Sequence, residues 1–271
     1  MHRDWRRICD QFMEATSYTP EGWDAWWQDR SYDRDAAPPT YLNYPDAACR
    51  VALGEPDFPE GVDLWNTFRS RRSKRNFLAE PMALNALNVL LWSSQGITAD
   101  MGDYQLRTAP SSGALYPIET YVVVNAVNGL QPGVYHLDVA NWALEGLALG
   151  DHRRVAHEAL RGQAMTEHAA VNIIWTAVVE RCRAKYFERA YRYIWWDSAV
   201  VAENFLLAAT GLGIGACTMG SWYDDLVHEL LGIDGKEHVS VLTASVGPVE
   251  GQDWLVDRRP PVPSDFLKRT R

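Results

Sequence analysis

The sequence predicts a domain of mixed α and β structure, and three observations support this prediction. A β-branched and aromatic run at residues 118–125 is typical of a strand. A continuous apolar run at residues 171–179 is typical of a central strand. The leucines of residues 84–91 have the spacing of one helix face. With 271 residues, 47% of them hydrophobic, the chain can form one large domain, or one domain with an extension.

The first 62 residues are rich in tryptophan and proline and are predicted to be an N-terminal extension of a domain at residues 63–271. Short helices are expected near residues 3–16 and 22–29. The second helix would carry three tryptophans on one face: Trp23, Trp26 and Trp27. We expect the extension to pack on the domain as a lid. The alternative is a docking surface for a peptide or partner, because clustered aromatic side chains make good anchors.

The elements of the main domain follow in order. A hairpin is predicted over residues 133–149. Asp151 is expected to cap a helix that runs to Arg161. Asp197 is expected to start a strongly apolar helix that ends at Gly211, a residue type common after helix C-termini. The last predicted elements are a strand, a helix and a strand: residues 214–219, 222–231 and 239–246.

The composition limits the classes of function. The formal charge of −9 and the pI of about 5.3 argue against a nucleic-acid partner. The charged N-terminus is not typical of a signal peptide, and no apolar run reaches the length of a membrane span. The four cysteines form no CxxC pair, the histidines show no ligand spacing, and most histidines are expected at the surface. We therefore expect a cytoplasmic protein without a metal site.

Residues 71–75, Arg-Arg-Ser-Lys-Arg, form a candidate phosphate-binding segment. Arginine guanidinium groups bind phosphate oxygens in pairs of hydrogen bonds, and a serine hydroxyl adds another donor. The alternative is a solvated basic start of a helix, which is the better explanation for any isolated string of this kind.

Residues 110–117, Pro-Ser-Ser-Gly-Ala-Leu-Tyr-Pro, form a candidate turn against a flat ligand. The small side chains of Ser111, Ser112 and Gly113 allow backbone amides to approach a ring closely. The flanking prolines stiffen the approach. An ordinary loop that leads into the strand at residue 118 is the alternative.

Residues 211–216 match the glycine pattern of dinucleotide-binding motifs by letter, but their context rejects that function. The motif needs a strand before it and a helix after it, and the pattern here predicts the reverse order. A helix end that leads into a strand explains the first glycine.

Lys185 and Tyr186 place an amine beside a phenol, two groups that can move a proton. The alternative is an amphipathic helix with exposed charges, and spacing alone does not decide between them. The aromatic residues at 191–196 either form the wall of a substrate channel or pack in the core.

Together, residues 71–75, 110–117 and 185–186 resemble the SagB-type branch of the nitroreductase superfamily. The resemblance covers roughly residues 63–271. It implies an FMN-binding α+β fold, with a mostly antiparallel central sheet surrounded by helices. It also implies a homodimer with two flavins at its interface, and the apolar helix at residues 197–210 is the expected spine of that dimer.

The resemblance implies roles for individual residues. Lys185 and Tyr186 are the expected catalytic pair. The chain departs from the family pattern at Phe187, where a glycine often follows the Lys-Tyr pair, and at Ala199 and Val200, where a glycine and a histidine are frequent. The expected FMN-binding residues come from the phosphate segment, the turn, the glycine-rich strand and the C-terminal tail: Arg71, Arg72, Ser73, Arg75, Pro110, Ser111, Ser112, Gly113, Cys217, Met219, Gly220 and Arg258.

The function implied by the resemblance is FMN-dependent oxidation of a peptide-derived or carrier-bound azoline to an azole. Hydride would pass to flavin N5, Lys185 or Tyr186 would take the proton, and oxygen would reoxidise the flavin. A cyclodehydratase is an additional expected partner. Two alternatives stay open: an NAD(P)H-dependent nitro or quinone reductase, and a non-catalytic docking subunit of a peptide-modifying complex.

Overall fold

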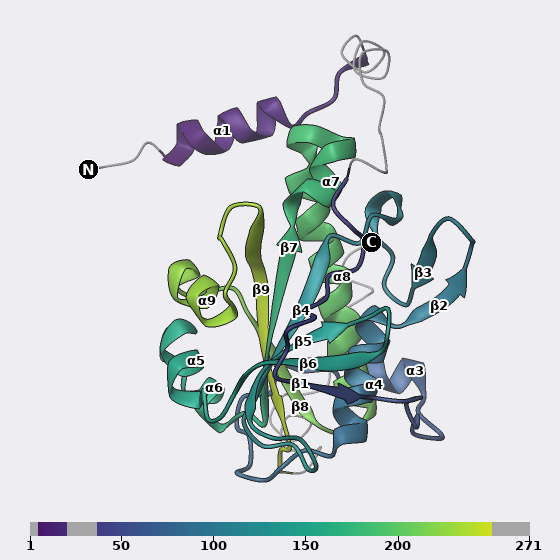
Figure 1. The fold of residues 1–271 in the computed structure, drawn as a ribbon, viewed down its shortest axis with the longest axis vertical. Helices are drawn as coiled ribbons and strands as arrows, with labels where there is room; N and C mark the ends of the chain where they lie inside the picture. Colours follow the sequence, from purple (N-terminus) through teal and green to yellow (C-terminus); the bar gives the residue numbers. More distant parts are fainter. Residues whose placement is uncertain (1–4, 21–36, 251–271) are drawn as a thin grey trace, which may run out of the picture.

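The structure is a computed structural model that describes residues 5–20 and 37–250. A seven-stranded sheet forms its centre, and helices cover both faces of the sheet (Figure 1). All neighbouring strands of this sheet are antiparallel, which confirms the predicted architecture. The strands in their order across the sheet are β1 (Cys49–Ala52), β6 (Ala143–Leu149), β5 (Gly133–Asp138), β4 (Ile118–Val124), β7 (Val171–Val178), β9 (His238–Gly247) and β8 (Gly215–Met219).

The central strands are buried on both faces, which explains their continuous apolar sequence. In β4, Val122 and Val124 join the hydrophobic core on one side of the sheet, and Tyr121 and Val123 join the core on the other. Successive side chains of a strand alternate between faces, so both cores draw on the same strand. β7 is buried along all but its last residue. The two predicted strands, and the central place of the second, are confirmed.

The helices form two groups on opposite faces of the sheet (Figure 1). The first group is α3 (Leu64–Ser70), α4 (Leu84–Gln95), α7 (Val179–Tyr186) and α8 (Ala190–Gly211). The second group is α5 (Arg153–Ala159), α6 (Ala164–His168) and α9 (Asp224–Leu231). The smaller elements are a hairpin of β2 (Ile97–Asp100) and β3 (Gln105–Arg107), and the 3₁₀ turns η1 (Ser112–Ala114) and η2 (Phe187–Arg189).

The starts of α8, α5 and α9 differ from the prediction, and α9 begins at Asp224 rather than at residue 222. Helix α8 begins at Ala190, seven residues before the expected start at Asp197, because it continues directly from α7 and η2. Helix α5 spans Arg153–Ala159, so it starts later and ends earlier than predicted. The Asp151 carboxylate still accepts a hydrogen bond from the Arg153 backbone N–H at 2.9 Å. The expected helix at residues 22–29 and the C-terminal tail lie outside the described residues.

The N-terminal part contributes a helix and a strand. Helix α1 (Trp5–Ala15) confirms the first predicted helix and lies beyond the end of the sheet (Figure 1). It contacts α8 through Phe12 and Trp195, whose ring centroids are 5.4 Å apart. Strand β1 pairs with β6 at the edge of the central sheet. The proposed boundary between residues 62 and 63 stays a prediction.

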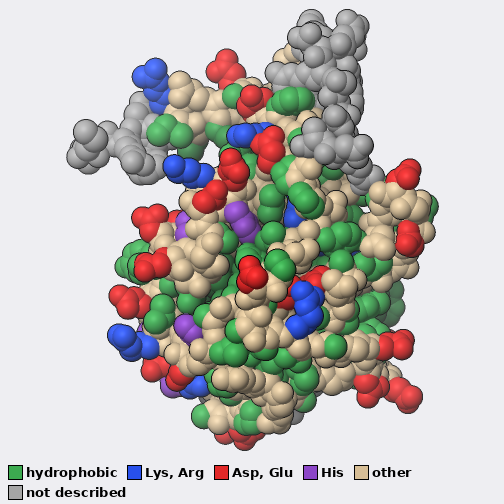
Figure 2. All heavy atoms as spheres, in the orientation of Figure 1, with side chains coloured by type: hydrophobic (Ala, Val, Ile, Leu, Met, Phe, Trp, Pro, Cys, Tyr) green, Lys and Arg blue, Asp and Glu red, His purple; other side chains and the backbone are tan. Residues whose placement is uncertain are grey.

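Acidic side chains surround the edge of the face shown in Figure 2, in keeping with the charge of −9. Within residues 5–20 and 37–250, no helix has the length and apolar character needed to cross a membrane. In the same ranges, no group of three or more His, Cys, Asp or Glu side chains could hold a metal ion.

Candidate active site

The turn at residues 110–117 is held by a buried carboxylate, Asp197 of α8. Asp197 accepts hydrogen bonds from the Ser111 hydroxyl (2.5 Å), the Ser112 hydroxyl (3.0 Å) and the Ser112 backbone N–H (3.1 Å). Burial raises the pKa of the Asp197 carboxyl, and these hydrogen bonds only partly oppose that effect. The serine side chains therefore fix the shape of the turn. Sequence reasoning missed this role, although an acidic residue within a strongly apolar stretch was its signal.

The backbone of the turn brings it against the Lys-Tyr pair. Gly113, Ala114 and Tyr116 have positive φ values of 67°, 53° and 47°, in a region that favours glycine. A Cβ atom added at Gly113 would lie 2.5 Å from the Tyr186 hydroxyl oxygen and 3.1 Å from Lys185 Nζ. Two segments that the sequence singled out separately are therefore in direct contact.

Lys185 and Tyr186 end α7 at a strained junction. Lys185 Nζ lies 5.4 Å from the centroid of the Tyr186 ring, and that ring packs edge-on against Tyr193 at 4.6 Å between centroids. Phe187, which follows, has φ 51° and ψ −130°, a combination that favours glycine. The position at which the family pattern often has glycine is thus one at which the backbone itself favours glycine.

The aromatic run after this junction lies partly at the surface. Trp195 and Trp196 are 50% and 53% exposed, so core packing does not describe them. The Trp196 ring lies 5.2 Å from the Tyr193 ring between centroids. An aromatic surface therefore extends from Tyr186 through Tyr193 to Trp196.

A buried chain of charged groups joins α7 to the sheet. Arg181 of α7 binds Glu119 of β4 at 2.5 Å, and Glu119 lies 2.9 Å from His136 Nε2. His136 Nδ1 lies 2.9 Å from Glu145 of β6, which binds Arg50 of β1 at 2.5 Å. Of these five residues only Arg50 reaches solvent appreciably. His136 is buried, rather than exposed as expected for most histidines, because β5 lies between β4 and β6.

Glu119 and His136 of this chain shift each other's pKa toward the charged form. Burial alone would raise the pKa of Glu119, but Arg181 and His136 outweigh it and hold that pKa at about 2. Burial alone would lower the pKa of His136, but Glu119 and Glu145 outweigh it and raise that pKa. Both ring nitrogens of His136 face carboxylate oxygens, so each must carry a proton and donate. His136 is therefore an imidazolium between two carboxylates.

The arginine segment lies beside β8. Ser73 forms a parallel bridge with Ala216, and the Lys74 backbone N–H donates to the Ala216 carbonyl at 3.1 Å. A Cβ atom at Gly215 would lie 3.1 Å from the Lys74 Cβ and 2.4 Å from a methyl carbon of Val249. Glycine at position 215 therefore permits the close approach of the two segments.

The charges of this segment fit a phosphate ligand. Arg72 and Arg75 are exposed and Arg71 is half-buried. The Arg72 guanidinium donates to the carbonyls of Arg69 and Arg71. Within the described part of the chain, none of the three arginines forms an ion pair with a carboxylate. Such a cluster, with the Ser73 hydroxyl, is the donor set that a phosphate monoester requires.

The remaining predicted cofactor residues are divided. Pro110 is exposed at the start of the turn. Cys217 and Met219 are buried in the hydrophobic core, so their side chains are engaged there. Gly220 is exposed, and a Cβ atom there would meet nothing within 4 Å. Arg258 lies outside the described residues.

Residues 68–247 match the sequence model of the nitroreductase family. The chain belongs to this family. It is 33% identical over 190 residues to the nitroreductase-like protein MJ1384 of Methanocaldococcus jannaschii. The matched region covers 69% of this chain and 91% of the relative. The expected membership of the nitroreductase superfamily is confirmed, and so is the nitroreductase-like fold.

Two further relatives of this nitroreductase-family chain are named for toxin processing. The trifolitoxin-processing protein TfxB of Rhizobium leguminosarum bv. trifolii is 29% identical over 138 residues, or 49% of this chain. The microcin B17-processing protein McbC of Escherichia coli is 25% identical over 156 residues, or 55% of this chain. The matched regions span 37% of TfxB and 57% of McbC.

Solved structures share the fold. A nitroreductase-like protein of Anabaena variabilis superposes with a TM-score of 0.74 at 26% identity, over 94% of this chain and 48% of that one. A chain of the E. coli microcin synthetase McbBCD complex superposes with a TM-score of 0.60 at 21% identity, over 89% of this chain and 87% of that one.

Proposed function

We propose that this nitroreductase-family oxidoreductase is an FMN-dependent dehydrogenase that oxidises a peptide-derived or carrier-bound azoline to an azole. The observation that carries the proposal is the contact between the exposed Gly113 turn and the Lys185–Tyr186 pair. It places an amine and a phenol at the segment expected to face a flavin ring. Two relatives named for processing trifolitoxin and microcin B17 support a peptide-derived substrate.

The residues present fit FMN. Arg71, Arg72, Ser73 and Arg75 would hold the phosphate, since the guanidinium groups have no carboxylate partner among the described residues. The turn at residues 110–113 would support the ring, and Gly220 leaves open space at the end of β8. FMN, when bound, supplies the hydride acceptor of the reaction.

The protein's own part in the reaction is to remove a proton and to hold the reacting groups in a fixed arrangement. Lys185 Nζ as a neutral amine, or the Tyr186 oxygen as a phenolate, would accept the proton from the azoline ring carbon, because both lie against the turn. Asp197 keeps the turn rigid through Ser111 and Ser112. A rigid turn holds the reacting atoms at a fixed distance, and such positioning supplies much of the rate enhancement of enzymes.

The active unit is a homodimer under this proposal. The turn is bound to Asp197, whereas the arginine segment lies beside β8, which follows the end of α8 at Gly211. These positions are separated by roughly 21 Å of helix at 1.5 Å per residue. The ribityl chain that joins the ring and the phosphate of FMN is much shorter. A second copy, with its own turn near these arginines, would complete one flavin site.

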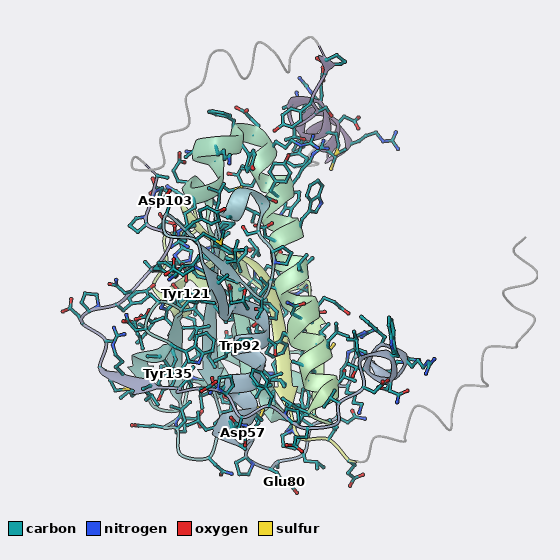
Figure 3. All side chains as sticks on the ribbon, turned by 90° about the vertical axis from the view of Figure 1, so that its right-hand side faces the viewer. Asp57, Glu80, Trp92, Asp103, Tyr121 and Tyr135 are labelled. Carbon is teal, nitrogen blue, oxygen red and sulfur yellow. The ribbon has the colours of Figure 1, made fainter. Side chains whose placement is uncertain are left out.

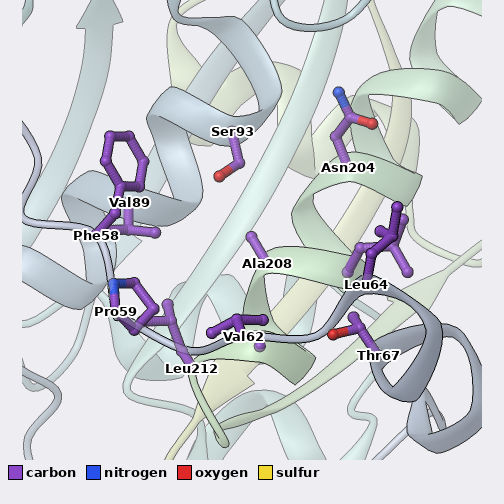
Figure 4. A pocket seen from close by; sticks show the side chains of 12 residues that line it. Phe58, Pro59, Val62, Leu64, Thr67, Val89, Ser93, Asn204, Ala208 and Leu212 are labelled. Atoms are coloured by element: carbon purple, nitrogen blue, oxygen red, sulfur yellow. The ribbon is translucent and has the colours of Figure 1, made fainter.

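The surface of α8 supports the same arrangement. Figure 3 shows α8 along the length of the domain, with α1 near one end and α3 beside the other. An apolar groove of about 360 Å³ lies between α3, α4 and α8, with Val62, Leu64, Ala208 and Leu212 in its lining (Figure 4). Leu64, Trp65 and Phe68 nearby are 54%, 66% and 50% exposed. A second copy of the chain that packs on this surface would bury these apolar side chains, as stable homodimer interfaces do.

Lysine and tyrosine variants test the catalytic part. Lys185→Ala and Tyr186→Phe should retain the yellow bound flavin and lose at least about 100-fold in turnover of a synthetic thiazoline peptide. Lys236→Ala and Tyr223→Phe are matched controls at exposed positions and should turn over normally. Normal turnover by either site variant would contradict its assigned role, and a purified protein that binds no FMN would contradict the cofactor assignment.

A reductase is the second candidate, because MJ1384 is matched at higher identity and along most of its length. Anaerobic NADPH distinguishes the two functions. Rapid bleaching of the flavin bands would favour a nitro or quinone reductase. Bands that persist with NADPH and bleach with the thiazoline peptide would favour the dehydrogenase. A cytoplasmic location belongs to the same proposal, and the four free cysteines of the chain agree with a reducing compartment.

A further inference from the structure

One side chain, Arg181, joins the catalytic helix to the turn. Its Nη1 donates to the Tyr116 carbonyl at 3.1 Å and to Glu119 at 2.5 Å. Its Nε donates to the Pro39 carbonyl at 2.6 Å. Arg181 is 3% exposed and lies one helical turn before Lys185. The end of the turn, the start of β4 and the segment before β1 are therefore all fixed to the helix that ends in the Lys-Tyr pair.

The partner of Arg181 is itself held rigidly. Glu119 accepts from the His136 imidazolium as well as from Arg181, and its pKa of about 2 keeps it ionised. His136 is bound on its other side by Glu145. Glu119, His136 and Glu145 each have an opposite charge on both sides, so none of these three can rotate away without leaving a buried charge unpaired. Arg181 therefore has a fixed anchor in the sheet.

We propose that Arg181 is a positioning residue, which sets the distance between the Lys185–Tyr186 pair and the turn. The proposal rests on the proposed function for the role of that pair. An arginine is needed because its planar fork serves three acceptors in different directions, whereas a lysine ammonium is a single point charge on a flexible chain. A shift of about 1 Å between reacting groups costs about 100-fold in rate, so small changes at Arg181 become visible in turnover.

Arg50 offers a comparison at the other end of the same chain of charges. It binds two carboxylates, Asp138 and Glu145, at 2.5 Å each, and its side chain is 43% exposed. It belongs to β1 and contacts neither α7 nor the turn through these bonds. A purely structural role for Arg181 predicts a loss of folding stability, larger than at the more exposed Arg50, with no selective effect on the catalytic pair. A positioning role predicts that only Arg181 affects the catalytic pair.

The experiment compares Arg181→Lys with Arg50→Lys in the full-length protein. For Arg181→Lys we expect kcat on a synthetic thiazoline peptide to fall by about 10- to 100-fold, with KM and FMN affinity within about twofold of wild type. Arg50→Lys should leave kcat, KM and FMN affinity within about twofold of wild type. Equal loss in both variants, or normal kcat in Arg181→Lys, would overturn the proposal.

A second measurement does not depend on turnover. Hydrogen exchange of the FMN-free protein should become faster in peptides that span residues 109–117 and 179–187 of Arg181→Lys, and should be unchanged there in Arg50→Lys. If wild type does not oxidise the thiazoline but this pattern appears, the proposed function fails and the positioning role stands. If exchange is unchanged in Arg181→Lys, the positioning role fails. The double variant Arg181→Met with Glu119→Gln removes both charges of the pair, and it replaces Arg181→Lys if that variant does not fold.

Discussion

Two carboxylates near the candidate site are buried to a similar extent and behave in opposite ways. Asp197, which holds the turn, is 5% exposed, and Glu119, which holds Arg181, is 3% exposed. Burial raises the pKa of Asp197, which accepts hydrogen bonds from the hydroxyls of Ser111 and Ser112 and from the Ser112 backbone N–H. The pKa of Glu119 is lowered to about 2, because a guanidinium and an imidazolium bind it.

The difference shows what decides the charge of a buried acid. Burial disfavours the ionised form of both residues, so burial alone does not distinguish them. Neutral donors compensate only part of the lost hydration of Asp197, whereas two cations more than compensate that of Glu119. The turn is therefore held by a carboxylate whose pKa is raised, and α7 by one whose pKa is lowered to about 2.

The largest effect is expected for Glu119→Gln. It leaves the charges of Arg181 and His136 buried with one partner fewer, which should lower the free energy of unfolding by about 3–5 kcal/mol. Urea denaturation measures it. Glu180→Gln is the control, because Glu180 and Arg183 form an exposed ion pair within α7. This substitution should cost about 0–1 kcal/mol. A loss below about 1 kcal/mol for Glu119→Gln would contradict the network described above.

Asp197→Ala should have the next largest effect, about 2–3 kcal/mol, because it leaves the half-buried donors of Ser111 and Ser112 without their acceptor. Asp234→Ala is matched in number of bonds, since Asp234 accepts from the backbone N–H groups of residues 236, 237 and 238, but Asp234 is at the surface. It should cost about 1 kcal/mol. Equal losses in urea denaturation would mean that burial adds nothing to the role of Asp197.

Substitutions at Phe187 test the backbone strain at the end of α7. Phe187→Gly and Phe187→Ala both remove the ring, but only glycine relaxes a backbone at φ 51° and ψ −130°. Glycine should therefore be more stable than alanine here by about 1–2 kcal/mol in urea or thermal unfolding. The usual order in helices is the reverse, with alanine favoured by about 1 kcal/mol. If alanine proves the more stable variant, the junction is not strained.

The smallest effect is a difference in pH dependence, on the order of 1 kcal/mol per pH unit for one proton. The pKa of Glu119 is lowered, so its contribution is present above its ordinary pKa of 4.5 and is lost as pH falls toward about 2. Glu119→Gln should therefore lose less stability in acid than wild type.

Asp197 has the opposite sign. Its pKa is raised, so its contribution is complete below its ordinary pKa, about 3.9, and is lost as pH rises through the raised value. Asp197→Asn should abolish that loss. Unfolding free energies of both variants between about pH 3 and pH 6 measure the two slopes, and slopes of the same sign would refute the contrast between the two acids.

The strands and most helices were predictable because burial of one or both faces of an element produces an apolar pattern in its local sequence. Residues 118–125 and 171–179 illustrate this, since each strand has neighbours on both edges and helices on both faces. The start of α8 was predicted seven residues late. The aromatic residues 191–196 show no apolar spacing that identifies them as the first turns of a helix. The histidine at position 136 was not expected inside, because its charged partners come from β4 and β6.

By itself the sequence determined the segments of the candidate site: the arginines at residues 71–75, the small turn at residues 110–117, and Lys185 with Tyr186. It did so because each segment is a short run whose chemistry is visible in its residues. Only the tertiary structure decided that the turn touches the Lys-Tyr pair, that Asp197 holds the turn, and that Arg181 and Glu119 join α7 to the sheet. These contacts join residues 62 to 86 positions apart in the chain, and no local pattern records which distant charges will be buried together.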